Sequence, residues 1–255
     1  MERSLDNPFE AHGIPHLSPS SCNLFTSSPA MFVMQKCLKK KGAVGPAAYR
    51  GSAVEDGVAY GLLNPEANFA DCTKVALEKF NTLAGFISGD KVEKERNAIP
   101  NMVEQGLMEL KPYGIPSSTQ GLISLDFDDL LVPMIGYYDF EWEQHGVLTD
   151  LKTTHALPSK ISQPHARQVA LYRAARGDNM QARVTYITPK KRATYALENA
   201  REHVDALGQI GRAIQRFLAV SKDPMELAML VIPDTGSFYF NDPVTRQMAF
   251  EIWNV

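Results

Sequence analysis

The sequence predicts one α/β domain, in which a mixed central β-sheet is flanked by helices and carries an added helical segment. Its 255 residues are 44% hydrophobic, which is enough apolar material for a packed core. Runs of strand-forming and helix-forming pattern alternate along the chain, as in α/β proteins. The strand-like runs are residues 122–125, 130–132, 137–140, 147–153 and 182–188. The helical patterns are residues 47–63, 165–176 and 204–218, with two more between 65 and 111 that are interrupted at 97–100.

The stretch from Gly136 to Tyr172 carries most of the polar chemistry of this domain. Asp139 lies in an aromatic run that favours a strand, and the turn residues 144–146 lead into a second strand-like run. When the two runs pair as a hairpin, Asp139 lies beside Asp150. Because strand side chains alternate between faces, Asp150 and Lys152 share one face of the sheet.

Two carboxylates and an ammonium group on one sheet face are costly to place together, and a divalent cation relieves that cost. Mg²⁺ or Mn²⁺ takes hard oxygen ligands, neutralises charge on a phosphate and lowers the pKa of a bound water. A lysine two residues after a ligand can position that water or stabilise the developing charge. The alternative is a solvated ion pair on an exposed hairpin, because the tripeptide Asp-x-Lys is common.

A helix that follows the hairpin brings in two more residues. It is predicted to begin near Pro164 and to end at Gly177. Gln168 and Tyr172 are four residues apart, so they lie on the same face of this helix. Ordinary helix packing is the alternative explanation for the pair.

The order and spacing of these elements resemble the RecB-like branch of the PD-(D/E)XK nucleases. The matching elements are Gly136 and Asp139, then the Asp-x-Lys-Thr of residues 150–153, then the Gln-x-x-x-Tyr of residues 168–172. The resemblance covers most of the chain, from residue 17 to about residue 188. It implies a PD-(D/E)XK nuclease core.

The N-terminal region adds to the resemblance. Residues 17–20 read Leu-Ser-Pro-Ser and are followed by an aromatic residue and a Ser-Pro pair, as in the N-terminal segment of RecB-like nucleases. That family often has a cysteine before the proline, where this chain has Ser28. The functional interpretation is that Ser18, Ser20 or Ser21 contacts a phosphate at a helix N-terminus. Helix capping is the simpler role for any one of these serines.

A third carboxylate is predicted in the helix over residues 47–63. Gly51 and Glu55 have the spacing at which RecB-like enzymes place Gly-x-x-x-His or Gly-x-x-x-Glu. The acid of the family at this position binds or orients a metal ion, and a glutamate is closer to the viral exonuclease pattern. Arg50, directly before Gly51, is a candidate substrate contact. A solvent-facing glutamate is the alternative for Glu55.

The resemblance therefore implies a complete site. Mg²⁺ or Mn²⁺ would be held by three carboxylates and one backbone carbonyl, those of Glu55, Asp139, Asp150 and Leu151. Lys152 would join the three acids as a catalytic residue by orienting or activating the attacking water. Gln168 and Tyr172 would hold the scissile region of the strand, with Ser18, Ser20 and Arg50 as further substrate contacts.

We expect residues 1–255 to form a single nuclease domain with four segments. They are the N-terminal helices with Glu55 (17–63), a helical elaboration (64–116), the catalytic sheet and helix (117–190), and a C-terminal helix and tail (191–255). The tail is rich in aromatic residues, for which core packing is favoured over stacking on DNA bases.

Cysteine usage and hydropathy narrow the class of protein further. The three cysteines, at positions 22, 37 and 72, have no zinc-binding spacing and are too few for a four-cysteine iron–sulfur cluster. No apolar run approaches the ~20 residues of a membrane span, and the N-terminus lacks the apolar region of a signal peptide. We expect a cytoplasmic protein, in the host cytoplasm if it is viral.

The net charge of −3 requires that basic residues be concentrated locally if the partner is a nucleic acid. Lysines gather within residues 36–41, and basic residues again at 190–192. Each cluster could equally be a solvated face or a helix end.

The predicted function is that of a metal-dependent deoxyribonuclease, an exonuclease that acts from duplex DNA ends in recombination, repair or phage DNA metabolism. The expected partners are DNA, a single-strand annealing or binding protein, and further copies of the chain in a ring. A structure-selective endonuclease on the same core is the first alternative, and a non-catalytic DNA-binding module is the second. The intact set of two acids and a lysine argues against the second alternative, because binding alone favours fewer negative charges near phosphate. A small-molecule hydrolase is not favoured, because the chain has no nucleophile elbow, Walker loop or histidine-rich metal spacing.

Overall fold

The computed structural model describes residues 7–85 and 87–255. It divides into two compact units, each built from several stretches of the sequence. The first unit comprises Met1–Ala43, Ser124–Gly136 and Arg201–Val255, and the second comprises Val44–Ile123 and Tyr137–Ala200. The single nuclease domain over residues 1–255 stays a prediction. No helix in the described part of the chain is long and apolar enough to cross a membrane.

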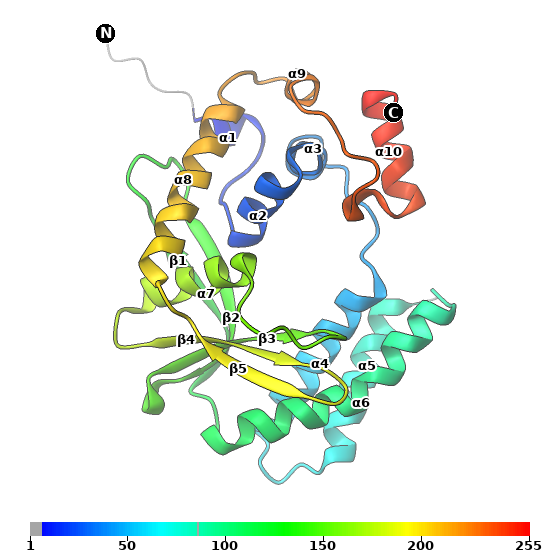
Figure 1. The fold of residues 1–255 in the computed structure, drawn as a ribbon, viewed down its shortest axis with the longest axis vertical. Coiled ribbons are helices and arrows are strands. Elements are labelled where there is room, and N and C mark those ends of the chain that lie inside the picture. The colour runs from blue at the N-terminus through cyan, green and yellow to red at the C-terminus, as the bar shows by residue number, and fades with distance from the viewer. Residues whose placement is uncertain (1–6, 86) are drawn as a thin grey trace. The chain divides into compact units, whose positions relative to one another are not determined.

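A five-stranded mixed sheet is the centre of the α/β fold, as Figure 1 shows in green and yellow. Its strands follow the order of the sequence: β1 (Ser118–Leu125), β2 (Met134–Trp142), β3 (Val147–Thr153), β4 (Gln181–Ile187) and β5 (Arg192–Ala196). β3 pairs with β2 antiparallel and with β4 parallel, and β4 pairs with β5 antiparallel. The predicted mixed sheet with flanking helices is therefore confirmed. The strand predicted at 130–132 is wrong, and β5 was missed because it is short and half-exposed.

The hairpin of β2 and β3 forms where the sequence predicts it. A short 3₁₀ turn, η3 (Glu143–His145), and Gly146 join the strands. Gly146 has a φ of 59°, a left-handed conformation in which glycine carries little cost. The connection from β3 to the parallel strand β4 runs through α7 (Gln163–Arg176), the usual crossover for parallel strands.

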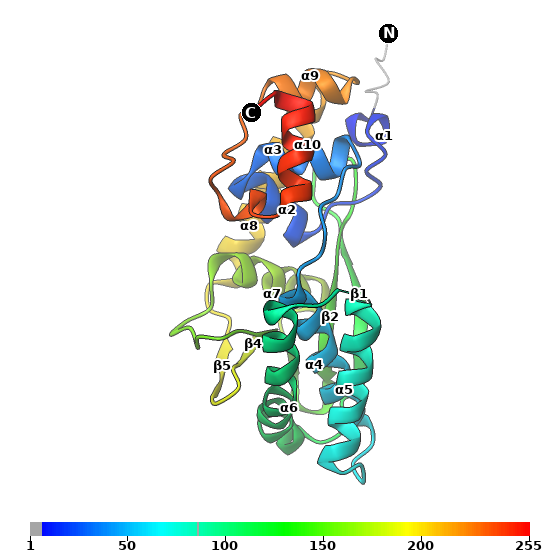
Figure 2. The same ribbon diagram turned by 90° about the vertical axis from the view of Figure 1, so that its right-hand side faces the viewer.

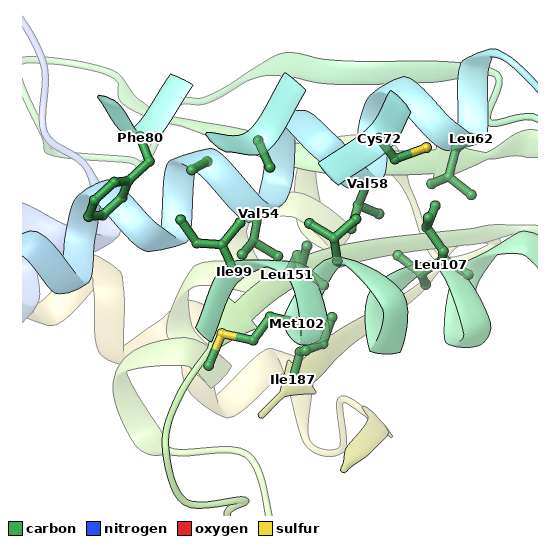
Figure 3. Close-up of a cluster of buried hydrophobic side chains, with 14 of the residues drawn as sticks. Val54, Val58, Leu62, Cys72, Phe80, Ile99, Met102, Leu107, Leu151 and Ile187 are labelled. Atoms are coloured by element: carbon green, nitrogen blue, oxygen red, sulfur yellow. The ribbon is translucent and has the colours of Figure 1, made fainter. Parts of the chain in front are cut away.

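Three helices of the second unit pack together and against the sheet (Figures 2 and 3). They are α4 (Pro46–Leu63), α5 (Phe69–Ala84) and α6 (Asp90–Leu110), and a 3₁₀ turn, η2 (Lys111–Tyr113), follows α6. Glycines let α4 approach its neighbours closely. A Cβ added at Gly57 would lie 2.8 Å from the Ala76 Cβ, and one at Gly61 would lie 2.7 Å from the Cys72 Sγ. The Cβ at Gly57 would also lie 2.8 Å from the Cys72 carbonyl oxygen, so a larger residue there would force α4 and α5 apart, whereas at Gly61 neighbouring side chains would have to shift.

The predicted interruption at residues 97–100 is wrong, because α6 continues through Pro100. Proline in a helix interior removes one backbone hydrogen bond and costs about 3 kcal/mol. Ile99, Met102 and Val103 flank it and are fully buried in the core of the three helices. Their burial, at about 1.5–3 kcal/mol for each large side chain, offsets that cost. Local pattern alone does not reveal this compensation.

The first unit is helical. Its elements are α1 (Pro8–Ala11), α2 (Pro19–Ser27), α3 (Pro29–Phe32) with a π-helical turn η1 (Val33–Cys37), α8 (Ala200–Leu218), α9 (Pro224–Met229), η4 (Phe238–Phe240) and α10 (Pro243–Trp253). The sequence did not predict α10, although Asp242 caps it and Pro243 occupies its first turn. Phe240 of the aromatic tail packs against Ala30 and Ala249, whereas Phe238 is exposed.

Candidate active site

Hairpin pairing brings two of the predicted carboxylates to adjacent strands. The β2–β3 register pairs Phe140 with Thr149 and Trp142 with Val147, so the next pair along the strands is Asp139 and Asp150. Both side chains are buried, at 9% and 1% relative exposure. The Leu151 backbone N–H donates to Asp139 Oδ2 at 2.6 Å, which fixes that carboxylate against β3.

Lys152 lies against these acids. Its ammonium nitrogen is 2.5 Å from Asp150 Oδ2, and its side chain keeps 28% exposure. Burial lowers the pKa of Lys152, but the carboxylates of Asp150 and Asp139 outweigh burial and leave it above its usual value. Lys152 is therefore a protonated ammonium group at neutral pH, suited to stabilising negative charge and not to removing a proton.

Glu55 comes to the same place from α4. Burial raises its pKa, a hydrogen bond with Asp139 lowers it, and the charge of Asp150 raises it, with a net increase. The pKa of Asp139 lies well above its usual value because of burial first, then the charges of Asp150 and Glu55. The prediction that Glu55 joins the two hairpin acids agrees with this electrostatic coupling.

One carboxyl oxygen of the cluster has no donor in the described part of the chain. Glu55 Oε1 is buried and has no hydrogen-bond partner among the described residues. Asp150 Oδ2 is buried as well, and its partner is the Lys152 ammonium. Buried acceptors of this kind are costly unless a cation or water satisfies them.

These donors fit a hard divalent cation as a partial ligand set. Across residues 7–85 and 87–255, no three His, Cys, Asp or Glu side chains form a ready-made metal position. Mg²⁺ does not require one, because it usually keeps several waters and takes one or two protein carboxylates plus substrate oxygens. The hairpin acids supply oxygen ligands of that kind.

The α7 pair meets as predicted, but its two members differ in exposure. Gln168 Nε2 donates to the Tyr172 hydroxyl at 2.6 Å, and that hydroxyl donates to the Tyr137 carbonyl at 2.5 Å. Tyr172 is completely buried, so the direct substrate contact predicted for it is wrong. It anchors α7 to β2 and orients Gln168, which keeps a partly exposed side chain.

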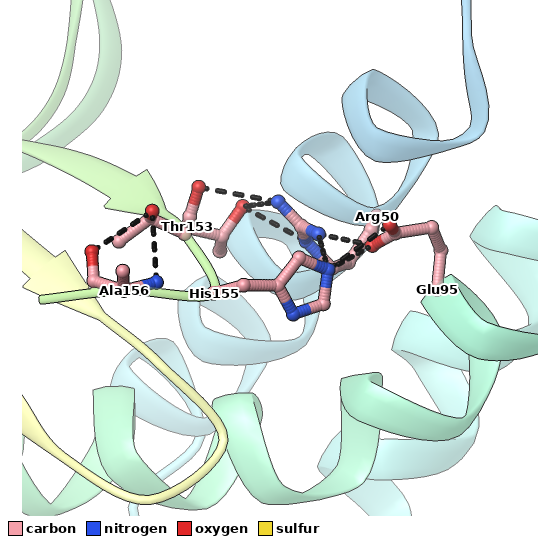
Figure 4. Close-up of polar contacts among 6 residues, drawn as sticks. Arg50, Glu95, Thr153, His155 and Ala156 are labelled. Atoms are coloured by element: carbon pink, nitrogen blue, oxygen red, sulfur yellow. Dashed lines mark hydrogen bonds and ion pairs between the residues drawn. The ribbon is translucent and has the colours of Figure 1, made fainter. Parts of the chain in front are cut away.

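Arg50, predicted to contact substrate, instead closes an internal network (Figure 4). Its side chain is 5% exposed and pairs with the Glu95 carboxylate. The nitrogen of that ion pair, Nη1, also lies 3.0 Å from His155 Nε2. The other two nitrogens donate to the Thr153 hydroxyl at 3.3 Å and to its carbonyl at 3.2 Å. The prediction for Arg50 is wrong because every face of the guanidinium is used within the protein. The network holds the end of β3, one residue after Lys152.

Two members of this network had no sequence signal. Glu95 lies within the charged run at residues 91–96, which has the composition of a solvated helix face. His155 lies in the loop after β3. Burial raises the pKa of Glu95, but hydrogen bonds and charge from His155 and Arg50 outweigh it and lower the pKa.

A second polar cluster that the sequence did not reveal lies farther along β2. Glu141 is buried and accepts hydrogen bonds from the Tyr138 hydroxyl at 2.7 Å, from the Ser118 hydroxyl at 2.9 Å and from the Arg176 guanidinium. These donors outweigh burial and lower the pKa of Glu141. The cluster joins β1, β2 and the end of α7, and so braces the helix that carries Gln168.

The candidate serines belong to the first unit. The Ser18 hydroxyl accepts from the Ser21 N–H at 3.1 Å and so caps α2. The Ser21 hydroxyl in turn accepts from the Ser18 N–H. Ser20 is exposed, and its hydroxyl lies 2.9 Å from that of Ser18. Phosphate contacts by Ser18, Ser20 and Ser21 stay a prediction.

The mixed sheet and its flanking helices form a fold that is shared with a solved structure. A crystal structure of a candidate exonuclease from Eubacterium rectale superposes on this chain with a TM-score of 0.57. The alignment covers 94% of this chain and 92% of that one, at 12% sequence identity. At that identity the similarity concerns the fold alone. A second solved structure, SSO0001, aligns over 75% of this chain and 89% of its own at 15% identity, but its TM-score of 0.36 is too low to inform the fold. No family model and no curated protein sequence matches the chain.

Proposed function

We propose that this chain is a metal-dependent deoxyribonuclease of the PD-(D/E)XK type. The observation that carries the proposal is the meeting of three acids and one ammonium group at the β2–β3 hairpin, with the buried Glu55 Oε1 left without a hydrogen-bond partner among the described residues. Such a cluster destabilises a protein that does not use it, because the acids repel one another and lose hydration.

Each residue has a role that follows from its position. Asp139 and Asp150, with Glu55 and the Leu151 carbonyl, would hold Mg²⁺ or Mn²⁺, which neutralises phosphate charge and lowers the pKa of a bound water. Lys152 stabilises the charge that develops on the phosphate and orients the attacking water. Gln168, fixed by Tyr172, binds the strand next to the scissile phosphate.

We propose further that the enzyme acts from duplex ends. Two observations support this choice: Glu55 follows the viral exonuclease pattern, and the chain shares its fold with a candidate exonuclease. A structure-selective endonuclease would use the same carboxylates and lysine, and differs only in how DNA reaches them.

One experiment tests both parts of the proposal. End-labelled linear duplex and covalently closed circular DNA are incubated with the protein in Mg²⁺ and in excess chelator. We expect progressive loss of nucleotides from the linear duplex in Mg²⁺, no cleavage in chelator and an intact circle. Full activity in chelator would refute the metal site, and rapid linearisation of the circle would establish an endonuclease.

A further inference from the structure

A second polar chain reaches the edge of the candidate site at the start of α7. The Ser162 N–H donates to the Tyr186 hydroxyl oxygen at 3.3 Å, and that hydroxyl lies 2.7 Å from His165 Nδ1. The rings of His165 and Tyr186 pack at 5.6 Å between centroids. This arrangement orients the imidazole from two sides.

The hydrogen bond at Nδ1 bears on which ring nitrogen carries the proton. The Tyr186 hydroxyl accepts the Ser162 N–H and lies 2.7 Å from His165 Nδ1, a contact in which either group can donate. When the hydroxyl donates to Nδ1, a neutral His165 carries its own proton on Nε2. Burial, and then the positive charge of Lys152, lower the pKa of His165, so the neutral form is favoured at pH 7.

The fold places His165 next to the residues that are proposed to carry out cleavage. Tyr186 is the register partner of Lys152 across the parallel β3–β4 pair. His165 precedes Gln168 by three residues and Tyr172 by seven, so all three lie on one side of α7. His165 is half-buried, and among the described residues its Nε2 has no hydrogen-bond partner and is not enclosed by the protein. Nε2 is thus free to bind something that approaches from solvent.

We propose that His165 is a further substrate-binding residue, whose Nε2–H donates a hydrogen bond to a phosphate oxygen of the bound strand next to Lys152. This inference rests on the proposed nuclease function. A neutral donor suits this position, because another cation would compete with Lys152 for Asp150. Tyr186 is a positioning residue that keeps the donating tautomer.

Three variants test the inference against a structural role. His165→Ala removes the donor, His165→Gln keeps an N–H donor at a similar reach, and Tyr186→Phe removes the hydroxyl that orients the ring. His145→Ala is the matched control, since His145 is an exposed histidine in the hairpin turn at the opposite end of β3. Binding to a short duplex is measured in chelator, where no cleavage is expected, and KM and kcat are measured in Mg²⁺.

We expect His165→Ala to weaken DNA binding and raise KM by about tenfold, the range for one hydrogen bond to a charged group. His165→Gln should recover most of that loss, and the control should match wild type. The salt dependence of binding should keep its slope in His165→Ala, because a neutral donor releases no counterion, whereas loss of a lysine contact lowers the slope by about one. In wild type, nitrogen-15 NMR of the His165 imidazole should show a single tautomer protonated at Nε2. In Tyr186→Phe the spectrum should instead show a mixture of the two neutral tautomers.

The outcomes separate the inference from the function on which it rests. Wild-type cleavage with unchanged affinity and KM in His165→Ala would overturn the inference alone. Equal losses in His165→Ala and His165→Gln, with equally lowered melting temperatures, would also overturn it and leave His165 as a packing residue. A wild-type protein that neither binds nor cleaves DNA would overturn both the inference and the proposed function.

Discussion

Replacing Arg50 with methionine should destabilise the protein, because the guanidinium is buried in a polar network at the end of β3. The change keeps an unbranched apolar stem but removes the guanidinium from Glu95 and Thr153. The pair is buried, at 5% and 13% side-chain exposure, so the remaining Glu95 carboxylate would be left without its strongest partner. Breaking a buried ion pair on one side costs about 3–5 kcal/mol. Because Glu95 keeps His155, we expect a loss of about 3 kcal/mol.

The assay is urea denaturation of wild type, Arg50→Met, Glu95→Gln and the double variant, followed by a double-mutant cycle. The double variant should be more stable than Arg50→Met by at least about 1 kcal/mol, because neutralising Glu95 removes the unpaired buried charge. Arg50→Met should also slow cleavage by tenfold or more, since the network holds β3 next to Lys152 and small displacements of catalytic groups are costly. A loss below about 1 kcal/mol, or strictly additive single changes, would refute this account.

Three further predictions concern the charged residues. Lys152→Ala should lower cleavage by about 10²–10³-fold with little change in DNA affinity, because the ammonium acts on transition-state charge; a near wild-type rate would contradict the site. Asp139→Asn should raise the melting temperature in chelator and abolish stabilisation by Mg²⁺. Burial and two neighbouring acids raise the pKa of Asp139, so its ionised form destabilises the fold at neutral pH. A lower melting temperature of the variant in chelator would contradict this prediction. Glu141 stabilises the fold above its usual pKa of 4.5, and this contribution is lost as pH falls through its lowered folded pKa. Wild type should therefore lose more stability than Glu141→Gln between about pH 5 and pH 3 in acid titrations followed by circular dichroism.

The sequence predicted the spatial neighbours of those residues whose contacts are set by local geometry. The turn at residues 143–146 and the two-residue period of a strand are enough to place Asp139 beside Asp150 and to put Lys152 on the face of Asp150. The four-residue spacing in a helix is enough to bring Gln168 to Tyr172. In each case the partners are close in the chain or joined by one turn, so few alternative arrangements compete.

Burial and long-range partners depended on the tertiary structure. Arg50 and Tyr172 carry polar groups that suit substrate binding, and nothing in their local sequence shows that the fold encloses them. Glu95 comes to Arg50 from 45 positions away, by the packing of α6 on α4.

By itself, the sequence determined the class of fold and the hairpin that brings the acids and the lysine together, because period and turn chemistry act over a few residues. The tertiary structure alone decided which polar side chains stay exposed to a ligand and which are used to hold the strands. That choice depends on desolvation and on partners from distant segments, whose free energies arise only when the helices and the sheet pack.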